Sequence, residues 1–70
     1  MASTTLRPGN RYRETMAQRF GRPAPEWIVE GTFVGNDGIE YARIALAADP
    51  SHRKTLSVAV LTDRRRFAAV

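Results

Sequence analysis

The 70-residue sequence contains no cysteine and a single histidine, His52. These absences exclude disulfides and thiolate metal ligands, and one imidazole cannot build a metal site alone. A chain this short rarely gains more than about 3–5 kcal/mol of net stability from its core. Packing or self-association must therefore hold the fold together. The lack of cysteine also suits a reducing compartment, so we expect a cytoplasmic protein.

Long apolar segments are missing as well. Runs such as Val58–Leu61 are far shorter than the roughly 20 apolar residues needed to cross a bilayer. Residues 1–6 lack the apolar segment of a secretory signal. Residues 1–23 are rich in arginine and poor in acidic residues, a composition that organelle transit peptides share with basic arms. We expect no membrane partner.

Motifs for catalysis and for cofactor binding are also lacking. The five glycines form neither Gly-x-Gly-x-x-Gly nor Gly-Lys-Ser/Thr. Ser51, His52 and Asp49 have the residue types of a triad, but adjacent side chains rarely meet in that geometry, so we interpret them as a polar turn. Asp37 and Glu40 are too closely spaced for a calcium loop. We therefore expect no enzymatic activity, catalytic residue, metal or cofactor.

What the sequence does contain is an uneven distribution of charge. Its 11 Lys and Arg residues exceed its 7 Asp and Glu residues, for a net charge of +4. Residues 1–25 carry this whole excess, because basic and acidic groups balance over residues 26–70. Such asymmetry points to an anionic partner such as DNA or RNA. The candidate nucleic-acid-binding residues are Arg7, Arg11, Arg13, Arg19, Arg22, Arg53, Lys54, Arg64, Arg65 and Arg66.

The candidates of the second half form two clusters, Arg53-Lys54 and Arg64–Arg66. Guanidinium groups suit phosphate oxygens because their planar fork donates two hydrogen bonds at once. The two clusters converge on one site if the turn before the last strand folds back. Otherwise they form a solvated rim that Asp49 and Asp63 balance.

The first 25 residues are predicted to form a basic arm. The Pro-Gly pair at positions 8 and 9 indicates a turn, and residues 1–9 are expected to be mobile. A short helix is predicted over residues 11–20, followed by a stiff proline-rich linker over residues 22–25. The predicted helix has an apolar face, because residues four positions apart share one side of a helix. This face consists of Tyr12, Met16 and Phe20.

Residues 26–70 are predicted to form a small β domain. Strands are expected over residues 27–34, 39–46, 55–60 and 67–70, with a hairpin turn at 35–38 and a tight turn at 61–65. The fold class is mainly β (α+β): a short N-terminal helix, then a four-stranded antiparallel meander. This order resembles the SH3-like small barrel over residues 27–70, and an open sheet is the alternative. Such an analogy does not assign a function.

Several apolar residues are expected to pack within this domain. Gly31 inside the first strand indicates a bulge. Trp27 is interpreted as a core residue, with an exposed stacking role as the alternative. Phe33 and Tyr41 are expected to pair across adjacent strands. The predicted core residues of the second half are Leu56, Val58 and Phe67.

Two classes of function remain. The first is a non-catalytic interaction module that binds a protein partner or forms a homo-oligomer through a sheet edge or an amphipathic face. The alternative is a nucleic-acid-associated accessory domain that uses the arginine-rich arm and the patch from Arg53 to Arg66. Salt dependence separates the two, because only binding to a polyanion weakens steeply as salt rises.

Overall fold

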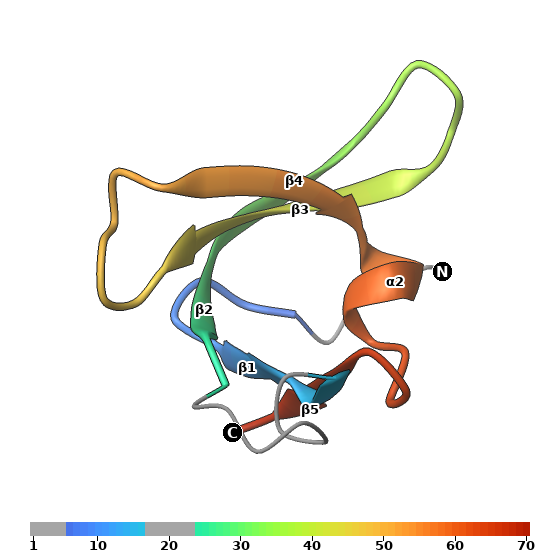
Figure 1. The fold of residues 1–70 in the computed structure, drawn as a ribbon. Helices are drawn as coiled ribbons and strands as arrows, with labels where there is room; N and C mark the ends of the chain where they lie inside the picture. Colours follow the sequence, from blue (N-terminus) through green and yellow to red (C-terminus); the bar gives the residue numbers. More distant parts are fainter. Residues whose placement is uncertain (1–5, 17–23) are drawn as a thin grey trace.

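The fold is mainly β and consists of five antiparallel strands in one open sheet, in the order β4-β3-β2-β1-β5. The computed structural model describes residues 6–16 and 24–70. The elements are β1 (Arg11–Glu14), β2 (Glu26–Val34), β3 (Glu40–Leu46), β4 (Arg53–Ser57), the short helix α2 (Val58–Leu61) and β5 (Phe67–Ala69). The sheet curls, so that β1 and β5 lie across the interior from β4 (Figure 1). One face of the sheet is therefore concave and the other convex.

The predicted helix over residues 11–20 is wrong for residues 11–14, which form β1. This strand lies between β2 and β5 and pairs with both. A period of two also fits these residues, because Tyr12 packs against the core while Arg11 and Arg13 contact Glu26 on the other face. An isolated ten-residue helix is marginal, whereas this strand gains hydrogen bonds along both edges. Residues 17–20 lie outside the described part of the chain.

Residues 6–9, before β1, are also part of the fold, contrary to the expectation that residues 1–9 are mobile, and residues 1–5 lie outside the described part of the chain. Leu6 is only 5% exposed and belongs to the hydrophobic core. The Gly9 N–H donates to the Val29 carbonyl at 2.8 Å, and the Val29 N–H donates to the Asn10 carbonyl at 2.8 Å. The sheet therefore has five strands rather than four, and the predicted simple meander is wrong for the last strand, because β5 pairs with β1 and not with β4.

The β2–β3 hairpin confirms the predicted strands over residues 27–34 and 39–46 and the turn between them. The two strands pair from Trp27–Leu46 to Val34–Glu40, with a register shift between Val29 and Gly31 that matches the predicted bulge. The turn between them contains Gly38 at a φ of 79°, a left-handed conformation that glycine adopts without steric cost. This hairpin extends beyond the rest of the sheet (Figure 1).

The predicted strand over residues 55–60 ends early. β4 covers Arg53–Ser57, and the chain then forms α2. The Ser57 hydroxyl accepts a hydrogen bond from the Val60 N–H at 3.2 Å and caps this turn. The turn carries Leu61 into the core, where it is fully buried. Burying Leu61 and reversing the chain toward β5 outweigh the β propensity of Val58 and Val60.

The core fills the concave side of the sheet. It contains Leu6, Trp27, Val29, Ala42, Ile44, Leu61 and Phe67. The expectation that Trp27 is a core residue is confirmed, since its side chain is 4% exposed. Of the predicted core residues, Phe67 is buried, while Leu56 and Val58 are partly buried and pack against the cluster. Within the described residues, no helix is long and apolar enough to cross a membrane.

Candidate functional site

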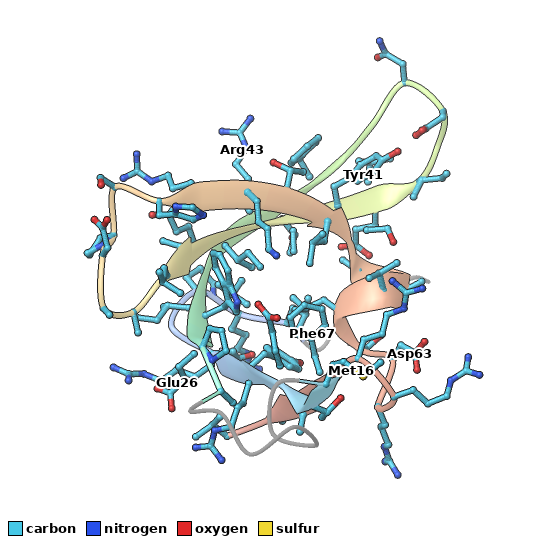
Figure 2. All side chains as sticks on the ribbon, viewed as in Figure 1. Met16, Glu26, Tyr41, Arg43, Asp63 and Phe67 are labelled. Carbon is cyan, nitrogen blue, oxygen red and sulfur yellow. The ribbon has the colours of Figure 1, made fainter. Side chains whose placement is uncertain are left out.

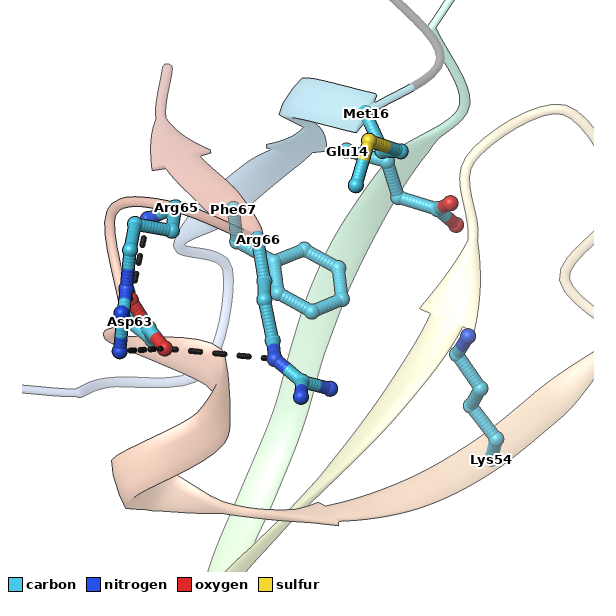
Figure 3. A pocket seen from close by; sticks show the side chains of 7 residues that line it. All are labelled: Glu14, Met16, Lys54, Asp63, Arg65, Arg66 and Phe67. Carbon is cyan, nitrogen blue, oxygen red and sulfur yellow. Dashed lines mark hydrogen bonds and ion pairs between the residues drawn. The ribbon is translucent and has the colours of Figure 1, made fainter.

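A hollow opens on the concave side, between β4 and the strands β1 and β5. Its volume is about 710 Å³. Lys54 lies across it from Arg66, and the ring of Phe67 faces the space between them (Figure 3). We call it the cationic hollow, and it is lined by Glu14, Met16, Lys54, Asp63, Arg65, Arg66 and Phe67. The structure thus brings one residue of the first basic cluster to two residues of the second.

The charges on one wall of the cationic hollow are partly neutralised by Asp63. The Arg65 Nε lies 3.3 Å from Asp63 Oδ1, and the Arg66 Nε lies 4.0 Å from Asp63 Oδ2. The Arg65 backbone N–H also donates to this carboxylate at 3.0 Å. This backbone bond and the adjacent guanidinium groups lower the pKa of Asp63 from its usual 3.8. Asp63 therefore orients both arginines while leaving them highly exposed.

The opposite wall is formed by Lys54, whose ammonium group lies 4.4 Å from the ring centroid of Trp27. The Trp27 Nε1–H donates to Glu14 Oε2 at 2.7 Å, which satisfies the buried indole. His52 stands 5.8 Å from the Trp27 ring, measured between centroids. Trp27 thus links residues of β1, β2 and β4 beneath the hollow.

The arginines of the predicted arm are placed differently. The Arg11 and Arg13 guanidinium groups lie 2.9 Å and 3.5 Å from the Glu26 carboxylate. These contacts lower the pKa of Glu26, and the hydrogen bond from Arg11 has the largest effect. Arg7 is exposed at the turn before β1. Arg19 and Arg22 lie outside the described residues.

The remaining basic candidates do not gather with the others. The Arg53 Nε lies 3.1 Å from Glu30 Oε2, on the convex face of the sheet. Arg64 is exposed in the turn before β5. Neighbouring residues of a strand point to opposite faces, so Arg53 and Lys54 are separated by the sheet itself. The two clusters therefore converge only through Lys54, Arg65 and Arg66. Nucleic-acid binding by these residues stays a prediction.

The triad-like residues of the β3–β4 loop form a turn. The Ser51 hydroxyl donates to Asp49 Oδ1 at 2.6 Å, and the Ser51 N–H donates to the same oxygen at 3.2 Å. The first of these bonds is the main cause of the lowered pKa of Asp49. In a catalytic triad the serine hydroxyl contacts the histidine, and the histidine contacts the acid. Here the Ser51 hydroxyl contacts Asp49 directly, and the His52 ring packs near Trp27. The three residues therefore do not have the arrangement of a triad.

The hairpin turn that offered oxygen ligands is held by its own hydrogen bonds. The Asp37 carboxylate accepts from the Tyr41 hydroxyl at 2.6 Å and from the Ile39 N–H at 2.9 Å. These bonds lower the pKa of Asp37, and the bond to Asp37 raises the pKa of Tyr41. In residues 6–16 and 24–70, no group of three His, Asp or Glu side chains is arranged to hold a metal ion.

A second surface, on the convex face, was not among the sequence-based candidates. The rings of Phe33 and Tyr41 are stacked, with centroids 5.5 Å apart and planes inclined by 26°. The Arg43 guanidinium lies 5.0 Å from the Phe33 centroid. Tyr41 and Arg43 lie on the outer side of the sheet, whereas Phe67 lies on the inner side (Figure 2). We call Phe33, Tyr41 and Arg43 the aromatic face.

The sequence contains a signal for this surface. Tyr41 and Arg43 are two positions apart on one strand, so they share a face, and the expected pairing of Phe33 with Tyr41 is confirmed. The bulge at Gly31 decides that Phe33 lies on the face opposite Trp27 and Val29, although strict alternation places all three together. The sequence alone therefore could not place Phe33 on the outer face, because that depends on the register of the strand pair after the bulge.

Together, these observations define a small mainly β protein with one curled antiparallel sheet, a cationic hollow on its inner side and an aromatic face on its outer side. No protein-family model matches the chain, and neither the curated proteins nor the solved structures contain a match.

Proposed function

We propose that the protein is a non-catalytic interaction module that binds a protein partner or a second copy of itself. The observation that carries this proposal is at the tip of the β2–β3 hairpin. There the side chains of Val34 and Ile39 are 67% and 48% exposed, on an element that extends beyond the sheet (Figure 1). Apolar side chains gathered on a projecting element are typical of surfaces that become buried in a protein complex.

The proposal includes a fold and a location that suit such a module. We infer that the sheet is an SH3-like small barrel, which its strand order, its curl and the single helical turn between β4 and β5 support (Figure 1). A chain without cysteine suits the reducing cytoplasm. The Ser51 hydroxyl is hydrogen-bonded to Asp49, which favours a structural role for the Asp49-Ser51-His52 turn and so supports a non-catalytic function.

The test is photo-crosslinking in living cells from the hairpin tip. A photoreactive amino acid replaces Val34 in one variant and Ser51 in a control variant. Ser51 is also exposed but lies in the β3–β4 loop, at the other end of the sheet (Figure 1). Position 34 is expected to form a discrete protein adduct, whose mass distinguishes a second copy from a different partner. Equal adducts from both positions, or none from position 34, contradict the proposal.

A second candidate function is favoured by the cationic hollow. Lys54 lies on β4, and Arg65 and Arg66 lie in the turn before β5, yet all three line one opening. Such convergence supports a nucleic-acid-associated role, with phosphate oxygens as the ligands and arm residues such as Arg7 as further contacts. Glu14 and Asp63 in the same wall reduce the net positive charge available.

The salt dependence of DNA binding tests this second candidate. Replacing Lys54, Arg65 and Arg66 with glutamine removes three cations without deleting any strand. If each contacts one phosphate, the slope of log K against log salt becomes about 2–3 units shallower. An unchanged slope shows that DNA binds elsewhere than at the cationic hollow. If the unmodified chain does not bind DNA at about 50 mM salt, this candidate function is wrong.

A further inference from the structure

We propose that the aromatic face binds single-stranded nucleic acid by stacking a base on Phe33. This proposal rests on the second candidate function, and it places base recognition on the convex side of the sheet, away from the cationic hollow. Phe33 is 38% exposed although its ring is large and apolar. Its ring stacks on Tyr41, at 5.5 Å between centroids, and the flexible side chain of Arg43 lies over it at 5.0 Å, so a base reaches the ring by stacking with or displacing that guanidinium.

A hollow of about 380 Å³ lies directly beside this ring. It is lined by Glu30, Gly31, Thr32, Phe33 and Arg43. Gly31 contributes only backbone to this hollow, and a Cβ built there meets no atom within 4 Å, so the space above it is open. Gly31 pairs with Arg43 and so lies on the same face as Phe33. A planar base can therefore enter beside Phe33 over bare backbone.

Arg43 supplies the positive charge of this face. Its guanidinium lies 5.0 Å from the Phe33 centroid, and within the described residues no carboxylate lies at ion-pair distance from it. Arg43 can therefore contact a phosphate or stack on a base without first breaking a salt bridge. Arg53, two positions along the neighbouring strand, adds a second exposed cation that Glu30 partly neutralises.

Stacked aromatic side chains with adjacent arginines suit single strands rather than duplexes, because base faces are accessible only when the bases are unpaired. Arg43 on this face, together with the net charge of +4 that residues 1–25 carry, is complementary to a phosphate backbone. A nucleic acid offers both a planar base for the aromatic rings and a phosphate anion for the arginine, whereas a protein ligand need offer neither. The aromatic rings and the positive charge of this face therefore favour nucleic acid as its ligand.

The experiment measures fluorescence anisotropy of labelled single-stranded DNA and RNA of about ten nucleotides, and of a duplex of the same length, at about 50 mM salt. Phe33→Leu keeps an apolar side chain but removes the π system, and Gly31→Val places a β-branched side chain in the hollow beside the ring. Val70→Leu is the matched control, because Val70 is an exposed apolar residue that belongs neither to the aromatic face nor to the hairpin tip. Thermal unfolding of each variant confirms that it is folded.

The proposal predicts that Phe33→Leu and Gly31→Val each weaken single-strand binding about 5- to 150-fold, the range of one base stack, while Val70→Leu leaves it unchanged. The duplex is expected to bind more weakly than the single strand. If all three variants bind alike and only the Lys54, Arg65 and Arg66 substitutions weaken binding, the stacking proposal is overturned and the cationic hollow keeps its role. If the unmodified chain binds no oligonucleotide, both are overturned.

Discussion

At the residue scale, the hydrogen bond between Tyr41 and Asp37 connects the hairpin turn to the aromatic face. It spans 2.6 Å and holds the Tyr41 ring, on which Phe33 stacks. The pKa of Asp37 is lowered, so its contribution to stability is fully present above the unfolded pKa and is lost as the pH falls through the folded pKa. The pKa of Tyr41 is raised, so its contribution is lost as the pH rises through the folded value.

Replacing Tyr41 with phenylalanine tests this bond while preserving the ring. The variant is expected to raise the pKa of Asp37 toward its usual 3.8 and to be less stable than the parent at neutral pH. The difference in unfolding free energy between the two proteins should shrink as the pH falls below that value. Carboxyl chemical shifts and urea unfolding measure the two effects. A difference in stability that is the same at acid and neutral pH contradicts the assignment.

Ile44 is the residue whose truncation best reports on the core. It is fully buried, and it lies on the central part of β3 opposite Val29. Ile44→Val should cost about 0.5–1.5 kcal/mol in unfolding free energy, because one buried methylene is lost. Thr55→Ala, on the exposed neighbouring strand, should change stability by less than about 0.5 kcal/mol. Denaturant unfolding measures the free energy of unfolding of both variants. If the two substitutions change it equally, Ile44 is not a core residue.

At the scale of elements, α2 converts a sequence with strand character into a turn. The Ser57 side chain caps its first turn by accepting from the Val60 N–H. The Thr62 hydroxyl donates to the Val58 carbonyl at 2.8 Å near its end. These side-chain bonds compensate for a helix too short to be stable alone.

Removing the Ser57 hydroxyl tests the importance of this cap. Ser57→Ala should lower the unfolding free energy by about 0.5–2 kcal/mol, because the Val60 N–H loses its acceptor. Ser57→Thr keeps a hydroxyl and should retain most of the stability. The measurement is the urea midpoint of each variant at equal slope. If threonine is as damaging as alanine, packing of the side chain rather than capping is the cause.

At the scale of the whole molecule, β1 joins the two halves of the sheet. It is hydrogen-bonded to β2 on one side and to β5 on the other. Leu6, just before it, packs in the core. A chain reduced to residues 26–70 therefore lacks the strand between β2 and β5 and has lost part of its core.

We predict that this shortened chain does not fold cooperatively. Circular dichroism should show neither a sheet spectrum nor a sharp thermal transition. In the full chain, amide exchange should protect the Val29 N–H, which donates to Asn10, as strongly as the amides of β3. A shortened chain that melts cooperatively shows instead that residues 26–70 form a domain by themselves.

Local features of the sequence determined much of the architecture. Residues 26–46 were predicted as a hairpin because β-branched and aromatic residues flank an Asn-Asp-Gly turn, and that signal depends only on neighbouring positions. The bulge at Gly31 was predictable for the same reason. Burial of Trp27 followed from its size and apolar character.

Only the tertiary structure decided the fate of Arg11–Glu14 and of Val58–Leu61. Both segments fit either period of hydrophobicity, and short segments take the conformation that gives them partners. β1 is a strand because two neighbouring strands supply hydrogen bonds, and α2 is a helix because its turn buries Leu61. The grouping of Lys54 with Arg65 and Arg66, and of Phe33 with Arg43, likewise depends on sheet curvature and on register across the bulge. Those are long-range properties, because each is set by contacts between residues distant in the sequence.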